Sequence, residues 1–142
     1  ISQLIEEYVK KVNFYIPLEL KILPDVKKSR KTPEKEQKIL EGDSIKKCLQ
    51  PSDYIVLLDD KGKQLTSIGF SKYIENKMIS VSKRLIFIIG GPYGFSEEIE
   101  AISNEKLSLS KMTLTHQMVR LLFTEQLYRA MTILNNEPYH HE

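Results

Sequence analysis

Residues 85–95 read LIFIIGGPYGF, in which five apolar residues end abruptly in Gly90-Gly91-Pro92. An apolar run rich in isoleucine is typical of a strand buried on both faces, and the glycines indicate a loop that exposes its main chain. In open α/β sheets, ligands bind where the strands end at their carboxyl edge. Glycine has no Cβ, so a flat ligand can lie directly against this loop. The stretch therefore predicts an α/β fold with a ligand site after residue 89.

A second stretch, residues 107–116, reads LSLSKMTLTH and is suited to the other side of such a site. Ser110, Thr113 and Thr115 stand among apolar residues. Apolar flanks can hold a ring while hydroxyl and main-chain groups bind its edge, and an adenosine offers both. Residues 54–58 form another apolar run that ends at Asp59-Asp60. This run predicts a second buried strand, whose carboxyl end would be a further wall of the site.

The beginning of the chain predicts a helix, a strand and a loop. Apolar residues recur at helical spacing over 4–12, and Pro17 ends this helix. Over 18–22, apolar and charged residues alternate as in a half-exposed strand, which Pro24 stops. Residues 26–32 are basic and without apolar periodicity, which predicts a loop.

A second helix is expected to start with Thr32 as its cap and Pro33 in its first turn. It should run to about residue 48 or 49, although Gly42 weakens it midway. Its buried side is expected to carry the apolar residues Ile39, Leu40, Ile45 and Leu49.

Beyond residue 58, turns and helices are expected to alternate with the strands. Lys61-Gly62 indicates a turn, and residues 67–78 predict a helix. Ser96 should cap a helix whose first turn is acidic, followed by a short strand at 107–109. The inward residues expected on the helix at 67–78 are Phe70, Tyr73 and Ile74.

Four motifs, taken in chain order, resemble one family. They are GGPYG at 90–94, LSLSKMTLTHQMVR at 107–120, EQLYRA at 125–130 and PYH at 138–140. The chain resembles the ribosomal large-subunit RNA pseudouridine N3-methyltransferases, which belong to the SPOUT, or α/β-knot, superfamily. The resemblance runs from Ile1 to Glu142 and implies one domain, 1–142, with a mainly parallel sheet flanked by helices and a C-terminal trefoil knot. It also leads us to expect a first strand before Ile1.

The resemblance further implies that the site binds S-adenosylmethionine in a bent conformation, mostly through main-chain groups. For Lys111, a solvent-facing charge on such a loop is the alternative interpretation. By position in the motifs, the cofactor-binding residues would be Leu58, Gly90, Leu109, Ser110, Lys111, Met112, Thr113 and Leu114.

Methyl transfer to the N3–H of a uracil-type ring requires alignment of donor and acceptor and loss of the N3 proton. Tyr139 and His140 in the C-terminal tail are the candidate catalytic residues, because histidine titrates near neutral pH and tyrosine can stack on an unpaired base. A tail without function, or a purification remnant, would give the same His-His ending. The family-like Tyr-His after Pro138 favours the native interpretation, whereas His141 stands where the family often has Arg or Lys.

The longest predicted helix, residues 116–134, is apolar in almost every direction. It is either the central core helix or a helix covered by a second subunit, which would make the protein a homodimer. Arg129 is expected either to pair with Glu125, four positions earlier, or, like Arg120, to contact RNA across such a dimer. His116 at the helix start is expected to be a positioning or capping residue.

Composition excludes several classes of protein. No apolar run approaches the length of a membrane span, no secretory segment is visible, and the lone Cys48 cannot form an internal disulfide, which together indicate a cytoplasmic protein. No triphosphate loop, dinucleotide fingerprint, Gly-x-Ser-x-Gly motif or zinc-ligand spacing is present. The net charge of +2 does not by itself indicate nucleic acid. A basic cluster that is either a solvated loop or an RNA phosphate contact consists of Lys27, Lys28, Arg30 and Lys31.

The expected activity is methylation of a pseudouridine N3 in 23S ribosomal RNA within the ribosome, with neither DNA nor a membrane as partner. We expect no appended RNA-binding domain, and we therefore expect recognition of a large preformed surface, which a ribosome supplies. Two alternatives stay open: a SPOUT methyltransferase for another RNA, such as transfer RNA, or a non-catalytic ribosome-binding assembly factor.

Overall fold

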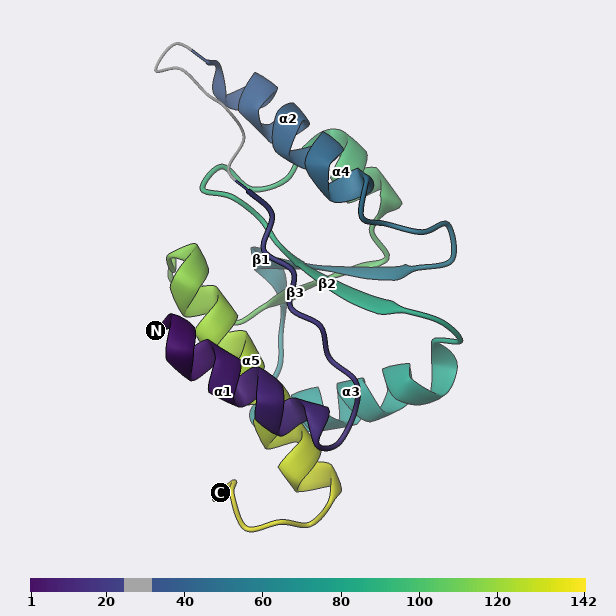
Figure 1. Cartoon of the computed structure of the whole chain (residues 1–142), viewed down its shortest axis with the longest axis vertical. Coiled ribbons are helices and arrows are strands. Elements are labelled where there is room, and N and C mark those ends of the chain that lie inside the picture. Colours follow the sequence, from purple (N-terminus) through teal and green to yellow (C-terminus); the bar gives the residue numbers. More distant parts are fainter. Residues whose placement is uncertain (25–31) are drawn as a thin grey trace.

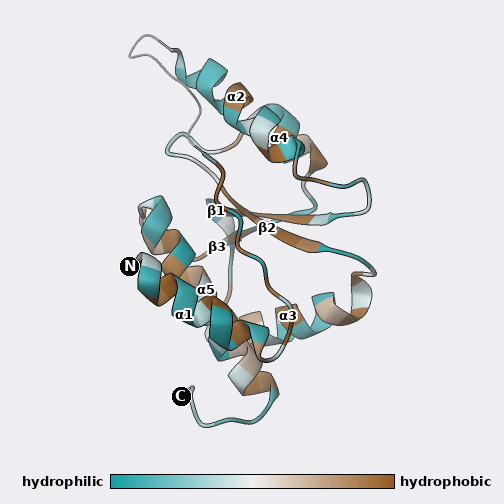
Figure 2. Ribbon diagram, viewed as in Figure 1, coloured by the Kyte–Doolittle hydropathy of each residue, from teal (hydrophilic) through white to brown (hydrophobic). Residues whose placement is uncertain are grey.

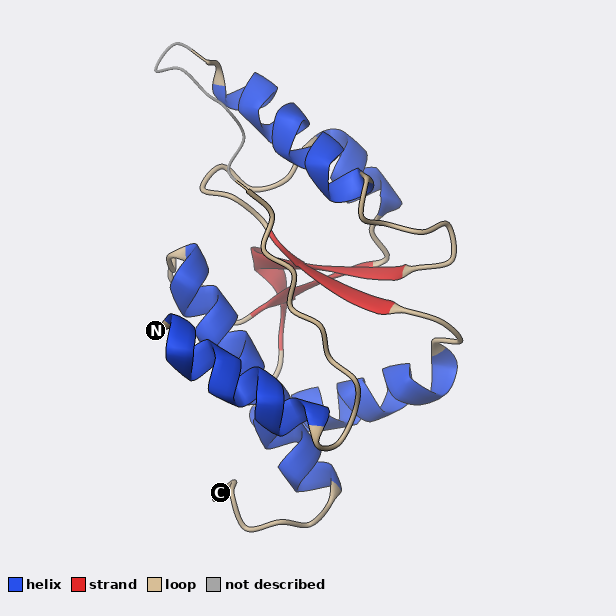
Figure 3. Cartoon of the chain, in the orientation of Figure 1, coloured by secondary structure: helices blue, strands red, loops and turns tan. Residues whose placement is uncertain are grey.

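The computed structural model describes residues 1–24 and 32–142. In this part of the chain, three parallel strands form one sheet in the order β2-β1-β3, with helices on both faces (Figure 1; Figure 3). The fold is therefore of the expected α/β class. The elements are α1 (Ser2–Asn13), α2 (Glu34–Lys46), β1 (Tyr54–Gln64), α3 (Ser67–Ser80), β2 (Leu85–Ile89), α4 (Glu97–Ile102), β3 (Glu105–Ser108) and α5 (His116–Leu134).

The two faces of the sheet are covered by different sets of helices because side chains alternate along β1. Val56 and Leu58 point into a core shared with α1, α3 and α5. Ile55 and Leu57 point the other way, into a smaller core with α4 and residues from α2. Figure 2 shows the resulting band of apolar strands between helices with polar outer surfaces. β1 is thus the central strand of the described sheet, packed on both faces.

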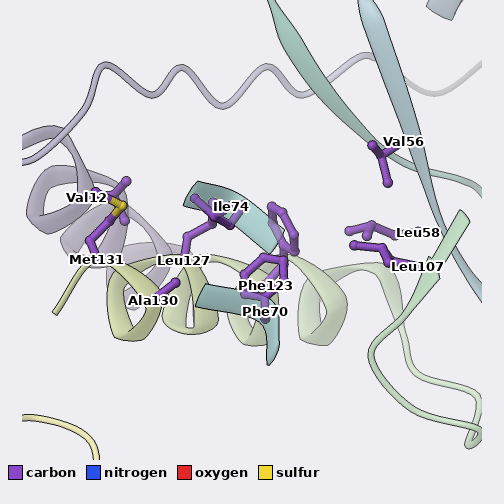
Figure 4. Packing of buried hydrophobic residues seen from close by; sticks show 10 residues of the cluster. All are labelled: Val12, Val56, Leu58, Phe70, Ile74, Leu107, Phe123, Leu127, Ala130 and Met131. Carbon is purple, nitrogen blue, oxygen red and sulfur yellow. The ribbon is translucent and has the colours of Figure 1, made fainter. Parts of the chain in front are cut away.

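The larger core is built around Phe123 of α5. Its ring lies 5.9 Å from that of Phe70 on α3 and 4.7 Å from that of Phe87 on β2, centroid to centroid. Figure 4 shows Phe123 next to Phe70, in a cluster that also contains the strand residues Leu58 and Leu107. Full burial of a side chain of this size contributes about 1.5–3 kcal/mol. This packing holds α5 against the sheet and therefore fixes the position of its N-terminal end relative to the strands.

Helix positions were predicted well from local signals. α5 has the predicted bounds, and α1 and α3 extend the predicted segments by two residues or so at their ends. Ser96 caps α4 as expected, since its Oγ accepts a hydrogen bond from Ile99 N at 3.3 Å. Thr115 does the same for α5 through Met118 N. Both faces of β2 are packed as predicted, yet Ile88 is buried and the other four residues are only half-buried, because β2 is an outer strand of the described sheet.

The predicted strand at 18–22 is wrong. Both main-chain groups of Leu18 are bound by the side chain of Asn13: Leu18 N donates to Oδ1, and Nδ2 donates to Leu18 O, each at 2.9 Å. Among the described residues, no strand pairs with this segment. Leu20 and Ile22 are accordingly exposed. Alternation alone does not make a strand when no ladder partner is available.

The predicted cap of the second helix is also wrong, and its predicted buried face is only half confirmed. α2 begins at Glu34 with Pro33 in the capping position and without a side-chain cap. Ile39 and Leu40 are exposed, while Ile45 and Leu49 are half-buried against the smaller core. Gly42 faces α4 so closely that a Cβ would lie 2.8 Å from the Oγ of Ser96. The glycine that was expected to weaken this helix is the point at which it packs.

The predicted turn at Lys61-Gly62 is wrong as well, because β1 continues through it to Gln64. The register of β1 against β3 shifts between Leu58 and Lys63, both of which pair with Leu107. A Cβ on Gly62 would lie 2.7 Å from the main-chain carbon of Leu107. Gly62 therefore permits a close approach of two strands inside an irregular ladder.

Candidate functional site

The carboxyl ends of β2 and β3 bring the predicted site segments together on either side of Leu58, which lies within β1 and not at its end as the apolar run had predicted. Leu58 pairs with Ile89 of β2 on one side and with Leu107 of β3 on the other. Neighbouring strands lie about 4.8 Å apart, so these three positions span roughly 10 Å. Gly90 directly follows Ile89, and residue 109 comes two positions after Leu107. The loops at 90–94 and 109–114 therefore leave the sheet on either side of Leu58.

The glycine loop is a tight turn that packs against an aromatic ring. Gly94 N donates to Gly91 O at 3.1 Å, and Gly94 has a φ of 84°, which disfavours residues with a Cβ. A Cβ on Gly90 would lie 3.0 Å from the ring of Phe95, which is buried. Gly90 is thus half-buried and packs against an aromatic ring on the side where a Cβ would stand.

Helix α2 braces the same loop. A Cβ on Gly91 would lie 2.5 Å from Oε2 of Glu41, and the buried Gln37 donates to Oε1 of Glu41 at 3.0 Å. Sequence patterns did not identify Phe95, Glu41 or Gln37 as supports of the site. The aromatic next to the glycines was a usable signal for Phe95, but nothing local connects α2 with residues fifty positions later.

The second loop, 109–114, is shaped by its own serines. Ser108 Oγ donates to Ser110 O, and Met112 N donates to Ser110 Oγ, both at 2.9 Å. Lys111 and Thr113 are exposed, as is the Met112 side chain at 77%, whereas Leu109 and Leu114 are half-buried. The loop therefore offers exposed main chain, hydroxyl groups and an unburied apolar side chain next to one another. Such a surface fits a ligand that has both a flat ring and polar edges.

His116 joins the two loops. Its Nδ1 lies 3.3 Å from the carbonyl oxygen of Gly90. Because a carbonyl only accepts, Nδ1 carries the proton in this contact. The start of α5 is thereby held beside the glycine loop, with its first main-chain N–H groups at the same edge of the sheet. This contact agrees with the positioning role expected for His116.

Tyr139 and His140 lie elsewhere, against the second half of α5. Tyr139 packs on Tyr128 with ring centroids 4.7 Å apart, and its hydroxyl donates to Glu125 Oε1 at 3.1 Å. Arg129 forms the expected ion pair with Glu125 at 2.6 Å, and its Nη1 lies 3.0 Å from Nδ1 of His140. The tail is therefore ordered on its own helix.

Within one chain, the tail and the loops form two separate groups. An α-helix rises 1.5 Å per residue, which places Glu125 and Arg129 roughly 14 and 20 Å along α5 from His116. Figure 1 shows the C-terminus beyond the end of α5 that points away from the sheet. The structure thus brings together the residues predicted to bind the cofactor, and separately the pair predicted to be catalytic.

Charge and burial decide what the tail can do. Burial, together with a hydrogen bond to Tyr8 and the charge of Glu125, raises the pKa of the Tyr139 phenol above its usual value. The phenol therefore stays protonated at neutral pH and can donate a hydrogen bond but cannot act as a base. The hydrogen bonds to Glu125 raise the pKa of Arg129, which keeps its positive charge.

The basic cluster, metal sites and membrane-spanning helices can be examined only over the residues that the structure describes. The basic cluster Lys27, Lys28, Arg30 and Lys31 lies outside the described residues. Over residues 1–24 and 32–142, no group of three or more His, Cys, Asp or Glu side chains is placed to hold a metal ion. In the same ranges, no helix is long and apolar enough to cross a membrane.

The parallel α/β sheet and the two loops after β2 and β3 are those expected of a SPOUT methyltransferase. Comparison with known families gives the same class. A model of the family described as "Predicted SPOUT methyltransferase" matches residues 1–140. The chain belongs to this family of methyltransferases, which confirms the resemblance drawn from its four motifs.

Individual relatives carry more specific names than the family does. A protein of Parabacteroides distasonis called ribosomal RNA large subunit methyltransferase H is 59% identical over 138 residues, which are 97% of this chain and 88% of the relative. A protein of the same name from Christiangramia forsetii is 55% identical over 141 residues, covering 99% of this chain and 90% of the relative. The one from Bacteroides thetaiotaomicron is 51% identical over 138 residues, covering 97% and 88%.

Proposed function

We propose that this protein transfers a methyl group from S-adenosylmethionine to N3 of a pseudouridine in 23S ribosomal RNA, as a cytoplasmic homodimer acting on the ribosome. Membership of the SPOUT methyltransferase family and the names of the relatives support the methyl transfer and the ribosomal RNA. The modified atom and the choice of pseudouridine come from the family resemblance of the motifs at 90–94, 107–120, 125–130 and 138–140.

The observation that carries the proposal is the pair of loops on either side of Leu58. We assign the methyl donor to the space between them, with contacts to Leu58, to Gly90 and to 109–114. The bare main chain of Gly90, the exposed main chain around Ser110 and the apolar Leu114 suit an adenosine ring and its polar edges. When bound there, S-adenosylmethionine supplies a methyl group that an in-line nucleophile can displace from sulfur. The trefoil knot belongs to the same proposal.

The protein's own contribution is alignment. The two loops fix the methyl donor, while Tyr139 and His140 hold the pyrimidine ring so that N3 faces the methyl group. Alignment and exclusion of water are the main requirements of such a displacement. The N3 lone pair forms the new N–C bond, the S–C bond breaks, and the N3 proton passes to solvent.

A homodimer follows from the distance between the two groups of residues. Because the tail lies roughly 14–20 Å along α5 from the loops in one chain, we propose that the tail of one subunit serves the loops of the other. Leu122 is exposed on α5 and offers an apolar contact for a second subunit. Both interpretations of α5 then hold, since α1 and α3 cover one part of the helix and a partner covers another.

The substrate is tested with S-adenosylmethionine labelled in its methyl group. Intact ribosomes, free ribosomal RNA and transfer RNA are incubated separately with the protein, and the nucleosides are analysed. We expect label only in the ribosome sample, in methylated pseudouridine. Label in transfer RNA would reassign the substrate. Calorimetric binding of the methyl donor with no transfer to any RNA would instead indicate the assembly factor.

The shared site is tested by mixing subunits. One variant carries Gly90→Val, which blocks the glycine loop, and the other carries His140→Ala in the tail. Each variant alone should be inactive, whereas subunits unfolded and refolded together should regain up to about a quarter of the wild-type activity, because one of the two sites in a mixed dimer is intact. Mixtures as inactive as the separate variants would exclude a site shared between subunits.

A further inference from the structure

Arg129 occupies the middle of a group of four side chains on the second half of α5. Its Nε and Nη2 both donate to Oε1 of Glu125, at 3.0 and 2.6 Å. The guanidinium also lies over the ring of Tyr139, with its carbon 4.7 Å from the centroid. Arg129 therefore holds the tail on two sides, through the carboxylate that Tyr139 shares and through the Tyr139 ring itself.

The remaining contact of Arg129 determines where His140 carries its proton. Nη1 of Arg129 lies 3.0 Å from Nδ1 of His140. A guanidinium has only donors, so Nδ1 must be the acceptor. A ring nitrogen that accepts has no proton, and the proton of the imidazole is then on Nε2. The free side of His140 is consequently an N–H group.

No other group in this cluster is available to take a proton. Oε1 of Glu125 already accepts from Arg129 and Tyr139, and its Oε2 accepts from Gln126 Nε2 at 2.9 Å. The Tyr139 phenol is protonated, and Tyr8 of α1, which hydrogen-bonds to it, is a second phenol. The side chains of this cluster can therefore donate hydrogen bonds to a ligand beside the tail, but they do not remove a proton from it.

We infer that Arg129 is a positioning residue that fixes the tautomer of His140, so that His140 meets the RNA base as a hydrogen-bond donor through Nε2 and does not remove the N3 proton. This inference rests on the proposed function and deepens it. It answers whether His140, a candidate catalytic residue because histidine titrates near neutral pH, takes the N3 proton.

The chemistry of the acceptor suits a donor. N3 of a uracil-type ring lies between two carbonyl groups, so the charge left by the N3 proton spreads over N3 and both oxygens. The proton itself passes to solvent. An N–H group aimed at one of these oxygens stabilises the anion that attacks the methyl group, which is how preorganised donors commonly act in enzymes.

The tautomer is measured directly by nitrogen NMR on protein labelled with ¹⁵N-histidine at neutral pH. The His140 signals are assigned by their loss in His140→Gln. We expect a proton on Nε2 and none on Nδ1 in the wild type, and a mixture of tautomers in Arg129→Ala. A proton on Nδ1 of the wild-type ring, alone or together with one on Nε2, would overturn the inference. This readout is independent of methyl transfer, so it holds even if ribosomes prove to be the wrong substrate.

The role in the reaction is tested by two substitutions of His140. A glutamine amide can place a donor near the position of Nε2 but cannot act as a base, whereas alanine can do neither. With ribosomes as substrate, kcat of His140→Gln should stay within about tenfold of the wild type, and that of His140→Ala should fall by about 100-fold or more. Equal losses in both variants would show that His140 is not needed as a donor.

Arg129→Lys and Arg129→Ala complete the test. Lysine keeps the charge but loses the planar fork, so the lysine variant should recover only part of the activity lost in the alanine variant. Both variants should bind S-adenosylmethionine as the wild type does in calorimetry, because Arg129 positions the tail that holds the RNA base and not the loops that hold the methyl donor. Full activity in Arg129→Ala with a disordered His140 tautomer would contradict a positioning role.

Discussion

The two ends of the sheet are built in opposite ways. Where β1 and β3 begin, one carboxylate oxygen of Glu105 accepts from Tyr54 at 2.8 Å, from Tyr73 at 2.6 Å and from Lys77 at 2.9 Å. Beside it, Asp53 binds Arg84 through both carboxylate oxygens. Where the strands end, the chain instead presents bare glycine main chain and the exposed loop 109–114. The charged groups at the beginning of the strands are bound to one another, whereas, within the described residues, the loops at the other end carry exposed residues without charged partners of this kind.

This difference separates stability from binding. Burial alone would raise the pKa of Glu105, but hydrogen bonds from Tyr73, Lys77 and Tyr54 lower it, so the carboxylate stays charged and the network stays closed. A closed network stabilises the fold but has no capacity left for a ligand. The loops after β2 and β3 keep that capacity because Gly90, Gly91 and Gly94 are only half-buried and residues 111–113 are exposed. Substitutions at the two ends should therefore have separable effects.

The largest effect is expected from Gly90→Val at the strand ends. The new side chain would collide with the ring of Phe95, so the loop main chain on which the ligand lies would have to shift. Binding of S-adenosylmethionine should weaken by about 100-fold, equivalent to about 2.8 kcal/mol, as measured by calorimetry. The glycine in α3 provides a matched control, since Gly69→Ala should leave binding unchanged. Normal affinity in Gly90→Val would place the ligand site elsewhere.

The second largest effect is expected at the other end of the sheet, on stability and not on binding. Glu105→Gln at the strand starts should lower the free energy of unfolding by about 1–2 kcal/mol in a urea titration, because Lys77 loses its partner in a partly exposed network. Affinity for the methyl donor should not change. Glu100→Gln, which removes an exposed pair with Lys106, serves as the control and should cost less. A large loss of affinity in Glu105→Gln would mean that the two ends are coupled.

The same network predicts a pH dependence. The pKa of Glu105 and that of Asp53 are both lowered, the latter mainly by the hydrogen bonds from Arg84. A carboxyl group with a lowered folded-state pKa stabilises the fold above its unfolded-state pKa and loses this contribution as the pH falls towards the folded value. Their ordinary values are 4.5 and 3.8, so stability should decline below about pH 4.5. Urea titrations between pH 7 and pH 3 should show a shallower decline in Glu105→Gln than in the wild type.

The smallest effect is expected from Lys111→Ala. The side chain is exposed on a loop that we propose to bind through its main chain. Affinity for S-adenosylmethionine should change by less than about twofold in calorimetry, since a solvent-exposed charge contributes little to a neighbouring contact. A tenfold loss would instead assign the lysine side chain a direct role at the strand ends.

Local signals predicted the parts of the fold that local chemistry controls. The apolar pattern of α5 predicted its bounds, and the apolar runs predicted β1 and β2. Predictions failed where a distant segment decides the outcome. Residues 18–22 lack a ladder partner among the described residues, and Gly42 and Gly62 were taken as a weak point and a turn. Both glycines permit contacts with α4 and β3, which no window of sequence around them contains.

The amino-acid sequence alone determined the class of fold, the family and the identity of the two loops, because glycine, proline and capping residues act on their immediate neighbours. Only the tertiary structure decided that Leu58 lies between the loops, that Phe95 and Glu41 support them, and that the tail lies on its own α5 away from them. These relations depend on strand register and on side-chain packing between distant segments. Such contacts are chosen by the free energy of the whole core, so no local pattern reveals them.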